Sequence, residues 1–373
     1  MGEQLHWHWF QSIKGVGQKE KEGLLEYWNA EKWFMAAQKG KTAELFEKMS
    51  YVTEKRKQEI CTILENKEQT ESAKRSFEKL CDKNIQMVSR EDLNFPKRLK
   101  HVYLSPFVLY YKGKLPADEM PSIGIIGARN CSTYGEEIAA EFAKVLSDAG
   151  IQIISGMARG IDGSAGRSAL KGAGGAYGVL GNGVDICYPK DNYRLYEDLC
   201  NFGGVLSEEI PGTMPANYLF PKRNRIIAGL SDALFVVEAR EKSGSLITVS
   251  YALEQGKEIY AVPGRIYDHL AEGTNRLIQE GAYLVREPAD ILDNFKDGIY
   301  RFSAFFEKKE ELLLATEEKI VYACLSLQPK HIEQIAEETG LEIPELMYLL
   351  FELEEKKWVK QPMKNYYMIQ SVI

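Results

Sequence analysis

The sequence predicts an α/β protein whose centre is a doubly wound, mostly parallel sheet, with a small helical domain before it and a three-helix module after it. Over the central part of the chain, short apolar runs alternate with amphipathic segments, which is typical of parallel strands joined by helices. Glycine and polar residues gather directly after those runs, where loops would lie. A chain of 373 residues has room for two or three domains.

The stretch over residues 121–136 organises the central domain. An apolar run over Ile123–Ile126 is expected to be a buried strand, and it breaks at Gly127 before Arg129. An amphipathic helix is expected after Gly135, so that backbone N–H groups and a guanidinium could meet a phosphate at the turn. The turn lacks the G-x-G-x-x-G fingerprint of dinucleotide-binding proteins. A connection that binds nothing therefore stays open as the alternative.

Further apolar runs are expected to be strands of the same sheet. They span Ser105–Gly113, Ile151–Ser155, Ala176–Leu180, Gly204–Leu206, Ala233–Glu238, Ile259–Val262 and Ala282–Val285. Glycine-bearing or polar corners follow most of them, and ligands of open α/β sheets bind at the carboxyl ends of the strands. Their joint placement predicts a site on that edge, although each glycine alone could serve only a tight turn.

The segment Phe220–Ile227 carries three cations and an asparagine behind an aromatic residue. Lys222, Arg223 and Arg225 can meet the phosphates of a nucleic acid, and Phe220 offers a ring on which a base can stack. This combination favours binding of single-stranded nucleic acid. In the alternative interpretation, Phe220 belongs to the core and the arginines pair with Glu208 or Glu238.

The first 82 residues are expected to form a small helical domain. Its apolar residues recur at helical spacing, and Ile13, Gly15 and Gly17 resemble the hairpin of a helix-hairpin-helix motif, whose N–H groups can hold a DNA phosphate. A plain glycine turn between helices is the alternative. We expect the sheet domain over residues 83–298, a linker over 299–315 and the last module over 316–373.

Bulk properties exclude several classes of protein. No apolar run reaches the length of about 18 residues that spans a bilayer, and the first residues lack the pattern of a secretory signal. The six cysteines are scattered without a C-x-x-C pair, which argues against a zinc site or a disulfide framework. We expect a cytoplasmic protein without membrane insertion or metal. Because the net charge is −7, any nucleic-acid site requires a local concentration of cations.

The C-terminal module has the pattern of a winged helix. Helices are expected over residues 317–325, 331–339 and 344–356, followed by a hairpin over 358–369. The third helix of such a fold usually reads duplex DNA. Here it carries four glutamates, Glu345, Glu352, Glu354 and Glu355. We therefore expect this module to bind protein or to stabilise a dimer instead of reading a major groove.

Motifs between about Phe95 and Asp290 resemble those of the DprA/Smf family of DNA-processing proteins, in the same order. The motifs are the G-A-R turn at Gly127, SGMARGID, GNGVDICYP, LSEE, FPKRNRIIAGLS, VVEA, SGSLIT, AVPG and GTNRLIQEGA. The resemblance implies an extended Rossmann-like domain and a homodimer that binds and protects single-stranded DNA and helps load the RecA recombinase in natural transformation. It implies no catalytic reaction and no cofactor.

The resemblance also implies which residues contact DNA. By position they are Gly127, Arg129, Ser155, Gly156, Arg159, Gly160, Phe220, Lys222, Arg223, Asn224, Arg225, Gly244 and Ser245. Two positions depart from the family pattern, since Ala128 replaces a hydroxyl residue and Gly166 stands where a histidine is common. The alternative is a nucleotide-processing enzyme of a related fold, similar to the phosphoribohydrolases, but the glutamate of their P-G-G-x-G-T-x-x-E segment is missing here.

Overall fold

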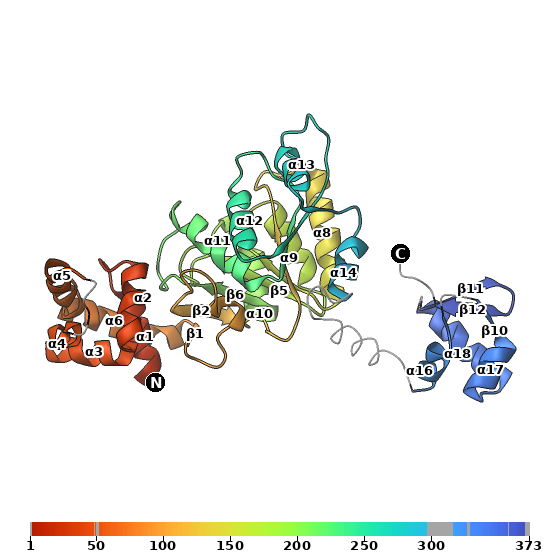
Figure 1. Cartoon of the computed structure of the whole chain (residues 1–373), viewed down its shortest axis with the longest axis horizontal. Coiled ribbons are helices and arrows are strands. Elements are labelled where there is room, and N and C mark those ends of the chain that lie inside the picture. The colour runs from red at the N-terminus through yellow and green to blue at the C-terminus, as the bar shows by residue number, and fades with distance from the viewer. Residues whose placement is uncertain are drawn as a thin grey trace. The chain divides into compact units, whose positions relative to one another are not determined.

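The computed structural model describes residues 2–47, 49, 52–296, 316–326, 329–356 and 358–369. The chain forms two compact units, Met1–Pro288 and Ala289–Ile373 (Figure 1). The expected linker over residues 299–315 lies outside the described residues. The expected boundary after residue 82 falls inside the first unit, so the division of that unit into two domains stays a prediction.

The first unit is built on a nine-stranded sheet with the order β1-β2-β6-β5-β4-β3-β7-β8-β9. Its strands are β1 (Gln86–Ser89), β2 (Val108–Gly113), β3 (Ser122–Ile126), β4 (Gln152–Ser155), β5 (Ala176–Leu180), β6 (Gly204–Ser207), β7 (Ala233–Val236), β8 (Glu258–Ala261) and β9 (Tyr283–Leu284). Pairing is parallel from β6 across to β9, whereas β2 is antiparallel to both β6 and β1. The expected doubly wound, mostly parallel sheet is confirmed, and β1 is a strand that the sequence analysis missed.

Helices cover both faces of this sheet. They are α7 (Lys97–Lys100), α8 (Thr133–Asp148), α9 (Ile161–Ala169), the short 3₁₀ helix η1 (Lys190–Asn192), α10 (Tyr193–Phe202), α11 (Leu219–Leu230), α12 (Gly244–Glu254) and α13 (Glu272–Gln279). Helix α9 packs against α8 and α10, and α11 packs against α7 and α12. Because parallel crossovers are right-handed, helices added on the two sides of β3 lie on opposite faces. Strands covered on both faces are apolar throughout, as every residue of β3 is buried.

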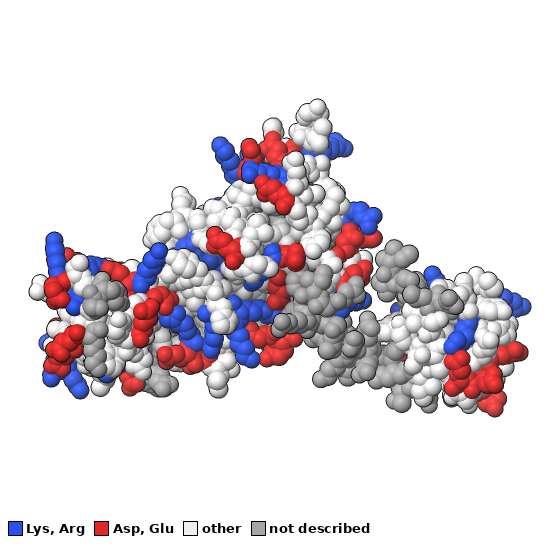
Figure 2. All heavy atoms as spheres, in the orientation of Figure 1, with Lys and Arg blue, Asp and Glu red and all other residues white. Residues whose placement is uncertain are grey.

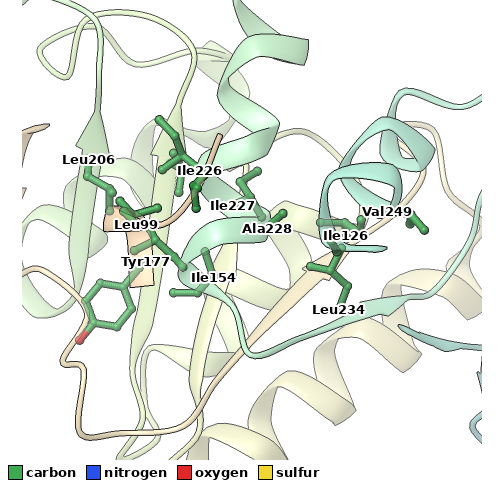
Figure 3. Packing of buried hydrophobic residues seen from close by; sticks show 14 of the residues in the cluster. Leu99, Ile126, Ile154, Tyr177, Leu206, Ile226, Ile227, Ala228, Leu234 and Val249 are labelled. Atoms are coloured by element: carbon green, nitrogen blue, oxygen red, sulfur yellow. The ribbon is translucent and has the colours of Figure 1, made fainter. Parts of the chain in front are cut away.

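Helix α11 closes the core over the middle of the sheet. Figure 3 shows Ile226 and Ile227 of this helix among apolar side chains of the strands, including Ile154 of β4 and Leu206 of β6. Since the helix begins at Leu219, the whole cationic segment over residues 220–225 is helical. Side chains three or four positions apart therefore share a face of the helix, and neighbouring positions do not.

In the part of the N-terminal region that the structure describes, six helices surround an aromatic core. They are α1 (Gly2–Ser12), α2 (Gln18–Tyr27), α3 (Ala30–Lys39), α4 (Thr42–Phe46), α5 (Glu54–Leu64) and α6 (Lys67–Asp82). Trp9 and Trp33 are almost wholly buried in it. This region packs on the first strands of the sheet, where the His8 ring bonds the Tyr110 hydroxyl at 2.7 Å and Phe10 meets Phe107 edge-on.

In the turn between α1 and α2, backbone N–H groups donate hydrogen bonds to side chains of the protein itself. The Gly17 N–H donates to Oε2 of Glu20 at 2.8 Å, and the Lys14 N–H donates to Oε1 of Gln69 at 3.4 Å. Gly15 has a φ of +88°, a conformation that suits glycine at a helix–helix turn. These bonds favour the plain turn over a hairpin that holds a DNA phosphate.

The second unit contains the expected winged helix. Its elements are α14 (Ala289–Lys296), α16 (Thr316–Ala323), β10 (Lys330–His331), α17 (Ile332–Thr339), α18 (Ile343–Glu355), β11 (Val359–Met363) and β12 (Tyr366–Ile369), with the small sheet in the order β10-β12-β11. Leu346, Leu350 and Leu353 of α18 lie in its core with Val321 and Ile335. The fold class is therefore as expected.

Candidate nucleic-acid interface

Two cavities that share part of their lining open at the carboxyl-end edge of the sheet, with volumes of about 450 and 460 Å³. The first lies between the turn after β3 and the loop after β7, where the strand order reverses. Ligands of doubly wound sheets bind at such a reversal. The second lies between that turn and residues 188–191. We call the two cavities together the groove.

Exposed cations line the groove. Arg129, Arg240 and Lys242 contribute to the first cavity, and Arg129 and Lys190 contribute to the second. None of these four has an ion-pair partner among the residues that the structure describes. Arg159 also lines the second cavity, but its Nε donates to Asp191 at 2.5 Å. Unpaired cations at one edge supply the local positive charge that a protein of net charge −7 needs to hold an anion.

Phe220 stands in the shared wall of the two cavities. The Arg129 guanidinium lies over its ring, 5.4 Å from the centroid, in a cation–π contact. The ring of Tyr188 stacks on Phe220 with centroids 5.5 Å apart and planes 18° from parallel. The half-exposed Phe220 and the exposed Tyr188 thus combine aromatic faces with a guanidinium.

Arg223 lies beneath the same wall and is buried. Its Nη1 donates to the carbonyl oxygens of Gly156 and Val179, while Nη2 has no hydrogen-bond partner among the described residues. Burial lowers the pKa of Arg223 to about 10, although the nearby Asp162 opposes this effect. Burial raises the pKa of Asp162 in turn, and its carboxylate accepts the Gly156 N–H at 2.9 Å. The site therefore holds a fixed guanidinium with a donor to spare.

The N-terminus of α8 does not offer the anion site that the sequence suggested. The Ser132 N–H donates to Oε2 of Glu238 at 2.9 Å, its hydroxyl donates to Oε1 at 2.5 Å, and the Gly135 N–H donates to Ser132 Oγ. A carboxylate of the protein itself thus sits at this positive end of the helix. The alternative pairing of an arginine with Glu238 is not seen among the described residues, because the Glu238 carboxylate forms this cap instead.

Lys222 and Arg225 lie away from the groove. The Arg225 Nη2 bonds both oxygens of Glu208 at 2.7 Å, and both side chains of this pair are nearly inaccessible. Lys222 bonds Glu209 at 2.9 Å and lies 3.2 Å from Glu208. Glu208 and Glu209 outweigh the effect of burial and raise the pKa of Lys222. The structure thus shows the Arg225–Glu208 pair of the alternative interpretation, and both cations are neutralised beside the N-terminal helices.

The SGMARG corner shapes the groove more than it lines it. Gly156 lines the second cavity, whereas Ser155 is buried and lines neither. Gly160 has a φ of +68°, and a Cβ there would lie 2.4 Å from the carbonyl oxygen of Ala128. Only glycine lets this corner press against the turn that carries Arg129. Gly166 lines neither cavity and packs against Leu195.

The remaining expected residues lie together at the first cavity. Gly127, Asn224, Gly244 and Ser245 all line it. The Asn224 amide donates to the carbonyl oxygen of Gly244 at 3.3 Å and so ties α11 to the start of α12. Ser243 caps α12 by accepting the Ser245 N–H. The α12 N-terminus therefore borders the first cavity, beside Arg240 and Lys242.

Four cationic or aromatic residues of the lining were not predicted from the sequence. Arg240 and Lys242 lie between the VVEA and SGSLIT motifs, and Tyr188 and Lys190 flank the proline that ends GNGVDICYP. Arg240 and Lys242 belong to the corner that follows the expected strand over Ala233–Glu238, so a count of cations within that corner could have found them.

The groove is a local feature of an otherwise mixed surface. Figure 2 shows Lys and Arg interspersed with Asp and Glu over the face that it draws. Among the described residues, no cluster of three or more His, Cys, Asp or Glu is placed to hold a metal ion. No described helix is both long and apolar enough to cross a membrane.

Comparisons with known proteins match both units. The sequence model described as DNA recombination-mediator protein A matches residues 86–296, and that of the DprA winged helix domain matches residues 308–361. Protein Smf of Escherichia coli K12 is 36% identical over 283 residues, which cover 74% of this chain and 75% of the relative. DNA processing protein DprA of Streptococcus pneumoniae R6 is 42% identical over 202 residues, which cover 54% of this chain and 71% of the relative.

Two solved structures are similar as well. The X-ray structure of DNA processing protein A from Streptococcus pneumoniae aligns with a TM-score of 0.63 at 32% identity, over 76% of this chain and 95% of that one. A structure of DNA processing protein A from Helicobacter pylori aligns with a TM-score of 0.53 at 27% identity, over 58% of this chain and 98% of that one. That structure was reported for the unique single-stranded DNA binding mode of its protein.

Proposed function

This chain belongs to the DprA/Smf family of DNA recombination-mediator proteins, and from that premise we propose that it binds and protects single-stranded DNA in the groove and helps load the RecA recombinase. One observation carries the proposal. Unpaired cations and a stacked aromatic wall converge at the sheet edge where the strand order reverses. Single-strand binders combine these two elements, with cations along the backbone and rings under the bases.

In this proposal, different cations of the groove contact different phosphates of the bound strand. Arg240 and Lys242 hold the backbone in the first cavity, Lys190 holds it in the second, and Arg129 lies between them. The spare Nη2 of Arg223 donates from below without any loss of side-chain freedom, because the guanidinium is already fixed. Phe220 and Tyr188 provide the ring faces for a base.

Of the thirteen positions that the family resemblance nominates, the proposal keeps those that line the groove. They are Gly127, Arg129, Gly156, Arg159, Phe220, Arg223, Asn224, Gly244 and Ser245. It assigns Ser155 and Gly160 to the shape of the corner, and Lys222 and Arg225 to the contact with the N-terminal helices. A homodimer would join two grooves on one strand and raise affinity through effective concentration.

The enzymatic alternative finds little support in the groove. Asp162 and Asp191 are the only carboxylates among the described residues that line either cavity. Asp162 is buried and accepts an N–H, and Asp191 pairs with Arg159. Neither is placed as a free general base toward a ligand.

Competition binding tests the proposal. Labelled oligo-dT is bound to the full chain and displaced by unlabelled oligo-dT, by a duplex of matched length or by thymidine monophosphate. We expect the single strand to displace the probe at far lower concentration than either competitor, with an affinity that falls as salt rises. The proposal would be overturned if the duplex displaced the probe as well as unlabelled oligo-dT does. It would also be overturned if thymidine monophosphate displaced the probe and unlabelled oligo-dT did not.

The mediator step has its own assay. The assay measures the rate of ATP hydrolysis by RecA on oligo-dT that a single-strand-binding protein already covers. We expect the full chain to raise that rate at concentrations where it occupies the DNA. No rise at saturating occupancy would leave DNA binding intact and refute the loading step.

A further inference from the structure

Helix α18 presents an unusual outer face. Its inner side, with Leu346, Leu349, Leu350 and Leu353, is buried in the winged-helix core. On the outer side, Ile343 is 43%, Met347 51%, Tyr348 62% and Phe351 60% exposed. Ile343, Met347 and Phe351 follow one another at intervals of four residues, so they form one stripe along the helix. Large apolar side chains gathered on one exposed helix face mark an interaction site.

Acidic residues border this stripe. Glu354 and Glu355, at the C-terminal end of the stripe, are exposed and have no ion-pair partner among the described residues. Glu345 is exposed as well, but it lies two positions from both Ile343 and Met347 and so on another face of the helix. Lys356, at the end of the helix, is engaged by Glu318 at 2.5 Å. The sequence from residue 316 to 373 holds ten Glu and six Lys, which gives −4 of the chain's net charge of −7. Figure 2 also shows acidic side chains gathered over α17 of this module.

Two occupants are disfavoured by this charge. A phosphate backbone would meet glutamates where a DNA-reading helix carries cations. The same face of a second copy would place like charges opposite each other, which costs free energy on association. The face is complementary to apolar side chains that are flanked by cations.

We propose that the outer face of α18 is a docking site for a protein partner whose binding segment is a basic amphipathic helix. Met347 and Phe351 are the apolar anchors, since methionine adapts its shape and a central aromatic ring carries much of the energy of such contacts. Glu354 and Glu355 meet the lysines or arginines of the partner and set its orientation. The winged helix thus recruits a partner while the groove of the first unit remains a separate surface.

A peptide of defined chemistry tests this assignment on the full chain. The probe is a labelled helical peptide with leucines on one face and lysines on the other, and its counterpart carries glutamates in place of the lysines. We expect the lysine peptide to bind at least about tenfold more tightly than the glutamate peptide. The double variant Met347→Ala/Phe351→Ala should weaken binding of the lysine peptide by at least about tenfold, and Glu354→Lys/Glu355→Lys should do the same.

Matched variants elsewhere exclude a general effect of charge or hydrophobicity. Phe202→Ala/Met214→Ala removes two side chains of equal type and similar exposure, and Glu31→Lys/Glu68→Lys makes the same charge change on exposed N-terminal helices. Both controls should bind the lysine peptide like the wild type. Equal losses in the controls would overturn the proposal. So would a concentration-dependent dimer, or duplex binding, that Met347→Ala/Phe351→Ala abolishes, because the face would then belong to a second copy or to DNA.

Discussion

At the scale of single residues, Phe220 and Arg129 are central to the groove because each of them lines both cavities. The Phe220 ring contacts both the Arg129 guanidinium and the Tyr188 ring, and it lines both cavities without carrying charge itself. Stacking of a base on an aromatic ring contributes about 1–3 kcal/mol in single-strand complexes. The contributions of ring and charge can therefore be separated by experiment.

We expect Phe220→Leu to weaken binding of oligo-dT by roughly tenfold while the dependence of affinity on salt stays unchanged, because a stacking face is lost but no cation. Phe220→Tyr should restore the affinity. Titrations of both variants at several salt concentrations check this. A changed salt slope in Phe220→Leu would mean that the ring acts by positioning Arg129 and not by stacking.

The sequence allowed the cationic segment to be found but not its two faces to be separated. Phe220, Arg223 and Asn224 lie three and four positions apart and line the groove, whereas Lys222 and Arg225 lie three apart and reach the glutamates after β6. No helix is expected over this segment from the sequence, whereas α11 already begins at Leu219. A helix predicted from residue 219 onward would have assigned these side chains to two different faces, because an α-helix has 3.6 residues per turn.

At the scale of elements, a buried charge cluster joins the N-terminal helices to the sheet. Lys21 of α2 is buried and donates from Nζ to the carbonyl oxygen of Gln11 at 2.9 Å. Burial and the nearby Lys222 lower its pKa from 10.5 to about 7, while Glu208 and Glu209 oppose the change. The folded protein therefore holds fewer protons than the unfolded chain between these two pKa values.

This shift predicts a pH dependence of stability. The full cost of burying a charged Lys21 acts below pH 7 and is relieved as the pH rises toward 10.5. We expect Lys21→Met to be more stable relative to the wild type at pH 6.5 than at pH 9, with a change of at most about 3 kcal/mol. Urea unfolding of both proteins at the two pH values measures it. A stability difference that does not vary with pH would show that the amine keeps its ordinary pKa.

The elements themselves were largely predictable, and the exceptions have physical causes. Runs such as Ile123–Ile126 are apolar throughout because both faces of the sheet are covered. The edge strand β1 was missed because it is a four-residue segment that begins with an exposed Gln86. The cap of α8 by Glu238 joins positions more than a hundred residues apart, which no local pattern can reveal.

For the whole molecule, charge is divided between two surfaces of opposite sign. The groove gathers unpaired cations on an acidic chain, and the winged helix holds more than half of the net negative charge. In our account the first surface binds single-stranded DNA and the second recruits a basic partner. The order of motifs along the sequence was sufficient to predict the family and the fold class. The lining of the groove required the structure, since its residues come from five different strand ends and helices.

The salt dependence of oligo-dT binding to Arg129→Ala is the most direct test of single-strand binding in the groove. Arg75→Ala, which removes an exposed arginine from α6, is the matched control. We expect Arg129→Ala to bind oligo-dT roughly tenfold more weakly than the wild type. The slope of log affinity against log salt concentration should also be smaller by about 0.7, which is the contribution of one phosphate contact on a single strand. Arg75→Ala should behave like the wild type. If Arg129→Ala binds as tightly as the wild type with the same slope, the groove is not the site of the single strand.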